Sequence, residues 1–361
     1  QALKRMDALP KINTVAVGHG PLLRQHLSHW LNDYREWSSQ RSKGDSYAAV
    51  CYLSQYGFSD RLSQAIAHGI GKADAQVQLV DLRATDPQEL TALVGEAKAV
   101  VVPTWPAEPD GELQASIGTL LAALQPKQLV GVYDAFGGND EPIDAVAEQL
   151  RNQGLKPAFE PLRIRQLPQG GDYQRCEESG TDLGQILTRK KSIEALRSID
   201  ANLDKALGRL TGGLYIVTAS QGEGDARRSG AMVASWVVQA SFRPPGLSVA
   251  VAKDRAIEAL MQVGDRFVIN VLRQDRYKPL MQHFLKRFPP GADRFEGVNV
   301  LHGAAEGGPV LTDALAYLSC RVEQRMEGPD HWIIYALVEQ GNVADIDGRT
   351  AVHHRKTGNH Y

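Results

Sequence analysis

The chain has 361 residues, of which 43% are hydrophobic and 23% charged, as in ordinary globular proteins with two or more domains. Its formal net charge of -2 argues against nucleic-acid partners and anionic membrane surfaces. Cys51, Cys176 and Cys320 lie far apart, which argues against disulfides and a cysteine zinc site and favours a cytoplasmic location. We expect all three to be buried. No apolar run reaches the roughly 20 residues that span a bilayer.

Residues 1–45 are expected to be the end of an upstream domain followed by a linker, since the chain begins with Gln1 and this segment is too short for its own core. A short strand-like run, INTVAV, leads into the loop GHGP. The neutral imidazole of His19 in this loop is suited to bind iron, although one histidine makes no metal site. His26 and His29 are expected on the surface of a polar helix.

From residue 46 to about residue 190, short apolar runs alternate with helical patterns. Strands are expected at 48–53, 77–82, 98–103, 127–133 and 159–167. Helices are expected at 60–70, 87–97, 112–125 and 144–154, with a polar helix to about residue 189. Gly69 and Gly71 are typical helix-ending residues and are expected to stop the first helix. The alternation predicts a doubly wound α/β domain with a parallel sheet.

A different pattern follows a polar linker helix predicted at 191–204. The β-rich runs, separated by glycine, proline and charged turns, lie at 213–220, 246–252, 267–272, 316–326 and 332–343. Only short helices, near 256–263 and 278–286, interrupt them. The pattern predicts a mostly antiparallel β-barrel over residues 205–361.

The first strand of the α/β domain runs into SQYGFSD and then a helix. Free backbone N–H groups and the helix dipole make such a loop an anion site. Ser54 and Ser59 add hydroxyl donors, and Gly57 permits close backbone approach. The loop has no lysine or arginine, unlike a nucleotide P-loop. Loops after the third and fourth strands belong at the same sheet edge, where Trp105 and Phe136 are placed to flank a flat ring.

These three loops resemble those of short-chain flavodoxins over residues 46–190. The resemblance implies FMN, with its phosphate held by Ser54, Gln55, Tyr56, Gly57, Phe58 and Ser59. It implies that the isoalloxazine ring lies against Pro103, Thr104, Trp105, Pro106, Asp134, Ala135, Phe136, Gly137 and Gly138. The alternative is a doubly wound domain without a cofactor, such as a CheY-like domain.

The stretch SGAMVASWVVQASFRPPGLSVAVAKDRA resembles the split-barrel flavin reductases. This resemblance implies a second FMN, with ring and ribityl contacts from Met232, Ala234, Ser235, Trp236, Ser241 and Phe242. It implies a phosphate turn of Lys253, Asp254, Arg255 and Ala256, and it matches His331 to a D-H motif. Gly230 and Val233 replace Asn and Thr of many reductases, which removes two donors. The other interpretations are core packing for Trp236, a solvated hairpin for the turn and a structural role for His331.

The order of the segments resembles the diflavin flavodiiron proteins of oxygenic phototrophs, and we interpret the chain as one that is truncated at its N-terminus. Residues 12–21 would then close a metallo-β-lactamase-like domain, with His19 as a ligand of a diiron centre completed upstream. The implied activity is that of an NAD(P)H:oxygen oxidoreductase, in which electrons pass through two FMN groups to the diiron centre and reduce dioxygen to water. A homo- or hetero-dimer with a related chain is also implied.

Two alternatives to this activity stay open. One is a flavin carrier that takes electrons from ferredoxin. The other is a non-catalytic subunit that binds a partner through its barrel. No side-chain acid or nucleophile with convincing spacing is found, so we expect no catalytic residue.

Overall fold

The computed structural model describes residues 47–136, 143–165, 167–301 and 303–358, together with Thr14 and Leu27. The chain divides into two units, Gln1–Asp45 and Ser46–Tyr361, and all of the helices and strands given below belong to the second unit. The predictions for residues 1–45, including His19 as a metal ligand, lie outside the described residues. None of the helices in the described part of the chain has the length and apolar character needed to cross a membrane.

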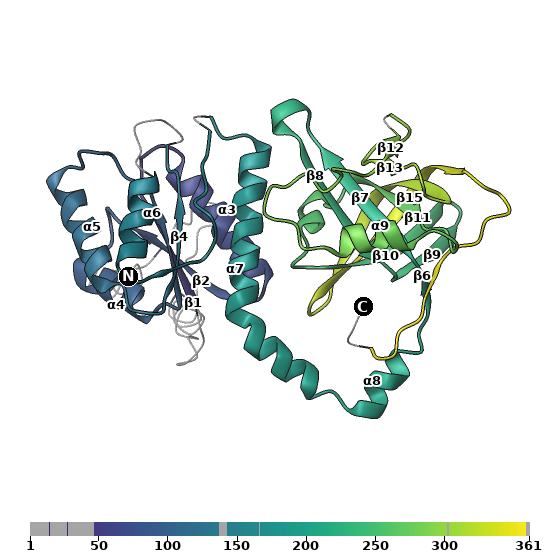
Figure 1. Cartoon of the computed structure of the whole chain (residues 1–361), viewed down its shortest axis with the longest axis horizontal. Coiled ribbons are helices and arrows are strands. Elements are labelled where there is room, and N and C mark those ends of the chain that lie inside the picture. Colours follow the sequence, from purple (N-terminus) through teal and green to yellow (C-terminus); the bar gives the residue numbers. More distant parts are fainter. Residues whose placement is uncertain are drawn as a thin grey trace. The chain divides into compact units, whose positions relative to one another are not determined.

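A five-stranded parallel sheet organises the first part of this unit (Figure 1). Its strands are β1 (Tyr47–Tyr52), β2 (Gln76–Asp81), β3 (Ala99–Pro103), β4 (Leu129–Tyr133) and β5 (Lys156–Pro157). The spatial order is β2-β1-β3-β4-β5. Every residue of β3 is buried, and its run of alanine and valine is typical of a strand covered on both faces. The order reverses between β1 and β3, so the loops after these strands border a topological switch point.

Helices cover both faces of this sheet, as the alternating pattern predicts. The helices are α3 (Ser59–Lys72), α4 (Pro87–Glu96), α5 (Gly111–Ala123), α6 (Ile143–Asn152) and α7 (Gly170–Arg197). Leu90, Leu120 and Leu150 from α4, α5 and α6 join one apolar cluster with the sheet. Leu62 of α3 and Leu183 of α7 join a second cluster on the other face. The doubly wound α/β fold is therefore confirmed.

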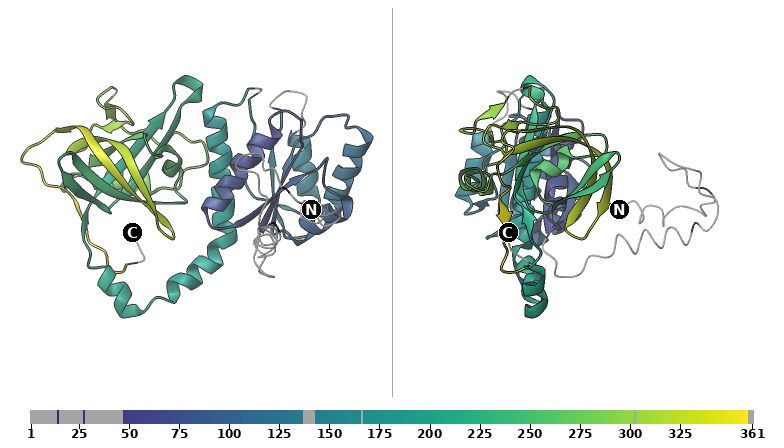
Figure 2. Two further views of the ribbon diagram at one scale, coloured as in Figure 1. Left: turned by 180° about the vertical axis from the view of Figure 1, so that it is seen from behind. Right: turned by 90° about the vertical axis from the view of Figure 1, so that its right-hand side faces the viewer.

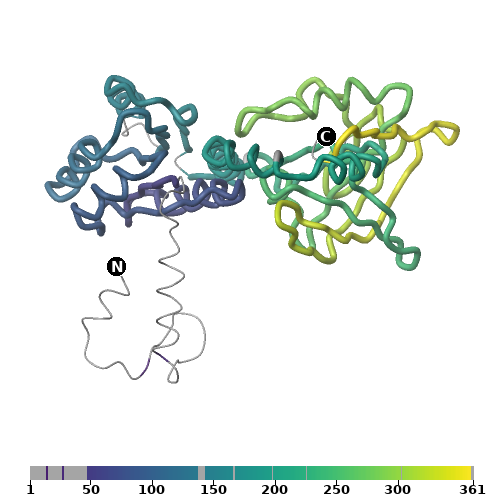
Figure 3. The backbone as a smooth tube through the Cα atoms, turned by 90° about the horizontal axis from the view of Figure 1, so that it is seen from below, coloured from purple at the N-terminus to yellow at the C-terminus, as the bar shows by residue number. Residues whose placement is uncertain are grey.

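The prediction that Gly69 and Gly71 end the first helix is wrong, because α3 continues to Lys72. Gly69 instead permits close packing of α3 against α7, since a Cβ atom there would lie 1.9 Å from the carbonyl oxygen of Glu177. Gly180 of α7 has the same role, because its Cβ atom would lie 2.1 Å from the carbonyl oxygen of Ile66. Figure 3 shows the two helices side by side.

The predicted fifth strand at 159–167 is also wrong. The structure has only the two-residue β5 before it, and a single bridge pairs Leu162 with Tyr133. Pro161 has no amide hydrogen to donate to a ladder, so regular pairing cannot continue through it. The segment follows β4 through separate hydrogen bonds instead, of which one joins the amide of Asp134 to the carbonyl oxygen of Leu162 at 2.9 Å.

The second part of the unit is an antiparallel seven-stranded sheet that curves on itself (Figure 2). In spatial order its strands are β8 (Arg228–Ala234), β7 (Tyr215–Gln221), β11 (Arg266–Val271), β14 (Ala316–Glu327), β15 (His331–Val343), β10 (Pro245–Ala252) and β9 (Val237–Phe242). Its interior contains fully buried apolar side chains such as Phe267, Ile269 and Ile334. The mostly β second fold is therefore confirmed.

Short elements complete the barrel. They are β6 (Gly212–Gly213) paired with β16 (Val352–His353), β12 (Val300–Leu301) paired with β13 (Val310–Leu311), and the helices η1 (Gly224–Ala226), η2 (Ala256–Leu260) and α9 (Lys278–Leu285). Before the barrel, α7 runs without interruption past residue 190 and is followed by α8 (Ala201–Leu207). The segment predicted as one linker helix at 191–204 therefore consists of the end of α7, a break at 198–200 and most of α8.

Candidate functional site

Three loops meet at the carboxyl edge of the parallel sheet. The amide of Phe58, at the end of the loop after β1, donates to the carbonyl oxygen of Ala135 at 2.7 Å. The amide of Ala135, in the loop after β4, donates in turn to the hydroxyl of Thr104 at 2.8 Å. Thr104 follows β3 and is fully buried. The structure thus brings together the three loops that the sequence assigned to one site.

The loop after β1 has a backbone shape that suits an anion. Gln55 and Gly57 both have positive φ angles, 60° and 54°. A Cβ atom on Gly57 would lie 2.5 Å from the carbonyl oxygen of Ala135, so glycine is required for the loops to approach. A non-glycine residue such as Gln55 in this conformation costs about 1–3 kcal/mol, and such strain concentrates at ligand sites. The close approach at Gly57 and the strained backbone at Gln55 make this loop a candidate ligand site.

The two predicted hydroxyl donors of this loop have different surroundings. Ser59 is fully buried, its hydroxyl accepts a bond from the amide of Leu53 at 3.0 Å, and it lies 3.1 Å from the hydroxyl of Tyr133. Burial raises the pKa of Tyr133 well above its usual value, so this phenol stays protonated. Ser54 is half-buried, and its amide donates to a carboxylate oxygen of Asp81 at 3.3 Å. Ser54 is therefore better placed than Ser59 to bind a ligand with its hydroxyl.

The predicted ring-binding residues occupy the other two loops. Phe136 is 42% exposed, and its ring centre lies 5.8 Å from that of Tyr56. Trp105 is half-buried and packs against the apolar core. Asp134 is buried, and its carboxylate accepts a bond from the amide of Ile164 at 3.0 Å, which gives it a structural contact. The remaining predicted residues are Pro103 at the end of β3, half-buried Pro106, and Gly137 and Gly138, which lie outside the described residues.

A separate cleft of about 380 Å³ lies against the barrel. Seven of the eleven residues predicted for the second flavin line it, namely Met232, Ala234, Ser235, Trp236, Asp254, Arg255 and Ala256. They come from β8 and the residues just after it, and from the turn after β10 together with the first residue of η2. The structure thus brings the predicted ring strand and part of the predicted phosphate turn to one cleft.

The hydroxyl of Ser235 is the clearest ligand-binding feature of this cleft. Ser235 is only 5% exposed, and its Oγ atom is buried with no hydrogen-bond partner among the described residues. Leaving a buried hydroxyl unpaired costs about 1–3 kcal/mol, which a ligand with a polar edge would recover. Val233, one of the two departures from the reductase pattern, also lines the cleft. Gly230, the other, packs against Ile257, whose Cα atom would lie 3.0 Å from an added Cβ atom.

The other four predicted residues do not line the cleft. The hydroxyl of Ser241 donates to the carbonyl oxygen of Pro244 at 2.7 Å, and Phe242 is 83% exposed. Lys253 forms an ion pair with Glu327 at 2.7 Å.

His331 reaches the cleft only through a neighbour. Its ring centre lies 5.1 Å from that of Trp236, which is 38% exposed and does line the cleft. The guanidinium of Arg355 lies 5.2 Å from the same Trp236 ring. His331 is therefore placed to fix the orientation of the indole.

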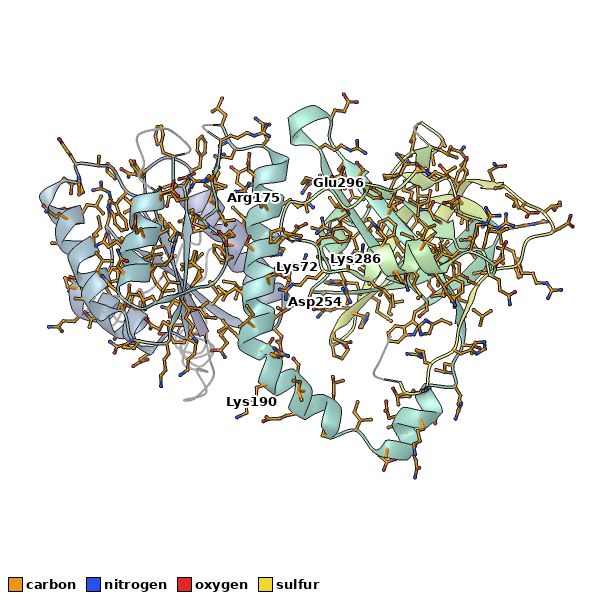
Figure 4. The ribbon with its side chains drawn as sticks, viewed as in Figure 1. Lys72, Arg175, Lys190, Asp254, Lys286 and Glu296 are labelled. Atoms are coloured by element: carbon orange, nitrogen blue, oxygen red, sulfur yellow. The ribbon has the colours of Figure 1, made fainter. Side chains whose placement is uncertain are left out.

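Several cleft residues were not predicted, because they come from distant segments. Helix α7 contributes Glu178, Asp182 and Gln185. The side-chain amide of Gln185 donates a hydrogen bond to a carboxylate oxygen of Asp254 at 2.9 Å. The segment after α9 contributes Lys286 and other residues (Figure 4 labels Asp254 and Lys286). The basic run LKRF at 285–288, which begins within the last residues of the helix predicted near 278–286, was the available signal in the sequence.

One histidine of the cleft and the three cysteines are further residues with possible metal or acid–base chemistry. His353 lines the cleft, and burial together with the positive charge of Arg355 lowers its pKa, so the imidazole is neutral at pH 7. Within the described ranges there is no group of three or more His, Cys, Asp or Glu side chains placed to hold a metal ion. The three cysteines are free and buried, as predicted.

Comparison with known proteins shows what each part of the chain is similar to. The family model described as "Flavin reductase like domain" matches residues 207–359. Diflavin flavoprotein A 1 of Synechocystis sp. is 54% identical over 360 residues, which cover 100% of this chain and 62% of that protein. Putative diflavin flavoprotein A 3 of Nostoc sp. is 53% identical over 361 residues, which cover 100% of this chain and 62% of that protein.

A solved flavodoxin-like domain from Synechococcus sp. is 51% identical to part of the chain. The match covers 39% of this chain and 99% of that domain, with a TM-score of 0.38. The two folds and these matches together show a flavoprotein in which a flavodoxin-like domain precedes a flavin reductase-like domain. The chain is similar along its whole length to the diflavin flavoproteins, and it spans about 62% of the length of the two relatives compared above.

Proposed function

We propose that this chain is a flavin-dependent electron-transfer module that binds FMN at two sites and takes electrons from NAD(P)H. When bound, FMN accepts electrons in pairs from a nicotinamide and releases them singly. Similarity to the diflavin flavoproteins along the whole chain and the two folds support flavin-based electron transfer, the chemistry of an oxidoreductase. The observation that carries the proposal is that one chain has both a glycine-dependent loop at a sheet switch point and a barrel cleft with an unpaired buried hydroxyl.

At the first site, neutral groups would hold the flavin phosphate. The backbone amides of Gln55 and Gly57 and the hydroxyl of Ser54 would supply the donors, because the amides of Ser54, Tyr56, Phe58 and Ser59 already donate within the protein. Helix α3 begins directly after this loop, so its N-terminus adds a favourable dipole. Phe136 and Trp105 supply apolar surfaces beside the ring. Thr104 keeps the loops of β3 and β4 together through its bond to Ala135.

At the second site, the residues of β8 would exclude water from one side of the ring, and Ser235 would bind a polar ring atom. Arg255 is exposed in the turn after β10 and would neutralise a phosphate. Trp236, held by His331 and Arg355, borders the cleft. Electron transfer from a nicotinamide requires no side-chain acid, so no catalytic residue is proposed.

We also propose how this chain would function as part of a longer protein. In a longer chain with an upstream metallo-β-lactamase-like domain, His19 would be one ligand of a diiron centre, which would supply the reduction of dioxygen to water. Dimerisation with a related chain is proposed for that protein. We propose the domain ranges 1–45, 46–190, 191–204 and 205–361 for the upstream remnant with its linker, the flavodoxin-like domain, the linker helix and the barrel.

The electron donor can be tested directly. The chain is loaded with FMN and titrated without oxygen, in separate experiments, with NADH, NADPH and reduced ferredoxin, while flavin absorbance near 450 nm is followed. We expect NADH or NADPH to bleach the flavin, and the cleft variant Ser235→Val to slow this. Bleaching by ferredoxin alone would support the carrier alternative, and failure to retain flavin would support the partner-binding alternative.

A further inference from the structure

Two segments of the chain contribute two groups of basic side chains to the barrel cleft. One segment is the predicted phosphate turn, from which Arg255 lines the cleft. The other directly follows α9 and contributes Lys286, Arg287 and Arg294. FMN carries one phosphate, for which Arg255 would provide a cation. A pyridine dinucleotide carries two phosphates of its own, and its nicotinamide must lie beside the flavin to react with it.

We propose that Lys286 and Arg287 bind the pyrophosphate of a pyridine dinucleotide, and that Asp182 of α7 is the counter-ion that this pyrophosphate displaces. The inference rests on the proposed function, in which FMN occupies the cleft and NAD(P)H is the donor. The group that Lys286 and Arg287 would recognise is a phosphate, and either the dinucleotide or FMN could provide it. Arg255 already gives the flavin phosphate its own cation, so the second group is assigned to the dinucleotide.

The ion pair at this subsite is one that an anion can replace. A guanidinium nitrogen of Arg287 lies 2.9 Å from a carboxylate oxygen of Asp182, with the side chains 68% and 30% exposed. Solvent screens such a pair, so it contributes little to stability. A phosphate offers arginine two parallel hydrogen bonds and a larger negative charge, so it competes well with a single carboxylate.

A neighbouring ion pair is built differently and keeps the segment in place. Arg294 pairs with Glu178 of α7 at 2.9 Å, and the two side chains are only 10% and 8% exposed. Glu178 also accepts bonds from the amide of Gly291 and the side chain of Gln174, both at 2.8 Å. Removing one partner would leave a buried charge unpaired, so this contact is not displaced by a ligand. It anchors the residues after Arg287 while Arg287 itself can change partners.

The test measures binding rather than turnover. The FMN-loaded full chain is titrated with NAD⁺, and the dissociation constant is measured by calorimetry at low ionic strength. Arg287→Gln is expected to weaken NAD⁺ binding about tenfold, the loss of a charged hydrogen bond. Asp182→Asn is expected to tighten it several-fold, because it removes the competing carboxylate. The matched control is Arg266→Gln, which removes an exposed arginine paired with Glu339 outside the cleft.

Flavin content and thermal unfolding of each variant separate the outcomes. The inference predicts that all three variants keep the FMN content and unfolding temperature of the unmodified chain. Loss of FMN from Arg287→Gln would assign the segment to the flavin phosphate and overturn the inference. The inference would also be overturned if Arg287→Gln bound NAD⁺ as tightly as Arg266→Gln does, or if Asp182→Asn left the NAD⁺ affinity unchanged. Failure of the proposed function is distinct, since the unmodified chain itself would then not be reduced by NAD(P)H.

Discussion

Replacing Gly57 by alanine tests whether the loop after β1 is the phosphate site of the flavodoxin-like domain. The φ angle of Gly57 is 54°, a conformation that costs about 1–2 kcal/mol for a residue with a side chain. The new methyl group would lie 2.5 Å from the carbonyl oxygen of Ala135, so the two loops would have to separate. Separation breaks the bond from the amide of Phe58 to that oxygen, which contributes about 0.5–1.5 kcal/mol.

In the free protein the mutated loop relieves this strain by moving, and FMN binding must restore the original arrangement. The combined cost of about 1.5–3.5 kcal/mol corresponds to roughly 10- to 300-fold weaker FMN binding. The assay is a fluorescence titration of the full chain with FMN, in which one of two sites should weaken and the other keep its affinity.

Gly154→Ala is the matched control for this experiment. Gly154 has a similar φ angle of 78°, but an added Cβ atom would have no neighbour within 4 Å. This variant should lose some stability and keep both FMN affinities. If Gly57→Ala bound FMN as tightly as Gly154→Ala, the assignment of the phosphate loop would be refuted.

Three further predictions concern single residues. Ser54→Ala should weaken FMN binding by about 1.5–3 kcal/mol, whereas Ser59→Ala should lower the free energy of unfolding by about 1–3 kcal/mol and change FMN affinity little. FMN titration measures the affinity of each variant, and urea unfolding measures its stability. Equal losses of FMN affinity in the two variants would show that this distinction is wrong. Burial would raise the pKa of Glu177, but the hydrogen bond with His68 and the charge of Lys72 outweigh it and lower this pKa from 4.5 to about 2. Ionised Glu177 therefore contributes about 3 kcal/mol that is fully present above pH 4.5 and is lost as the pH falls toward 2, and Glu177→Gln should flatten the acid limb of the urea-unfolding profile. Burial raises the pKa of the Cys51 thiol to about 12, so thiol reagents should label the native chain at none of its three cysteines and the unfolded chain at all of them.

Much of the fold could be predicted because strand and helix periods are local properties of the sequence. The four longer strands of the parallel sheet and five of the seven strands of the barrel sheet lie where these periods predict them, whereas β8 and β9 were not among the expected β-rich runs. The strand predicted at 159–167 could not be rejected from apolar content alone, because its failure depends on Pro161 and on the bond from the amide of Ile164 to the carboxylate of Asp134, directly after β4. Gly69 was misread because glycine both ends helices and allows helices to touch, and its partner Glu177 lies 108 residues further along the chain.

The candidate sites were predictable to different degrees for a related reason. The loop after β1 is one continuous segment with its own motif, so its residues could be proposed together. The second wall of the barrel cleft combines α7 with the segment after α9, and no local pattern joins these two segments. The inward direction of Ser59 is equally non-local, because Tyr133 of β4 determines it.

Flavin stoichiometry tests the central claim most directly. The purified chain is saturated with FMN, freed of excess by gel filtration and denatured, and the released flavin is then measured against protein concentration. Two FMN per chain are predicted, because the parallel-sheet loops and the barrel cleft are separate sites. A saturating ratio of one would contradict the account and would show that one of the two sites does not bind FMN.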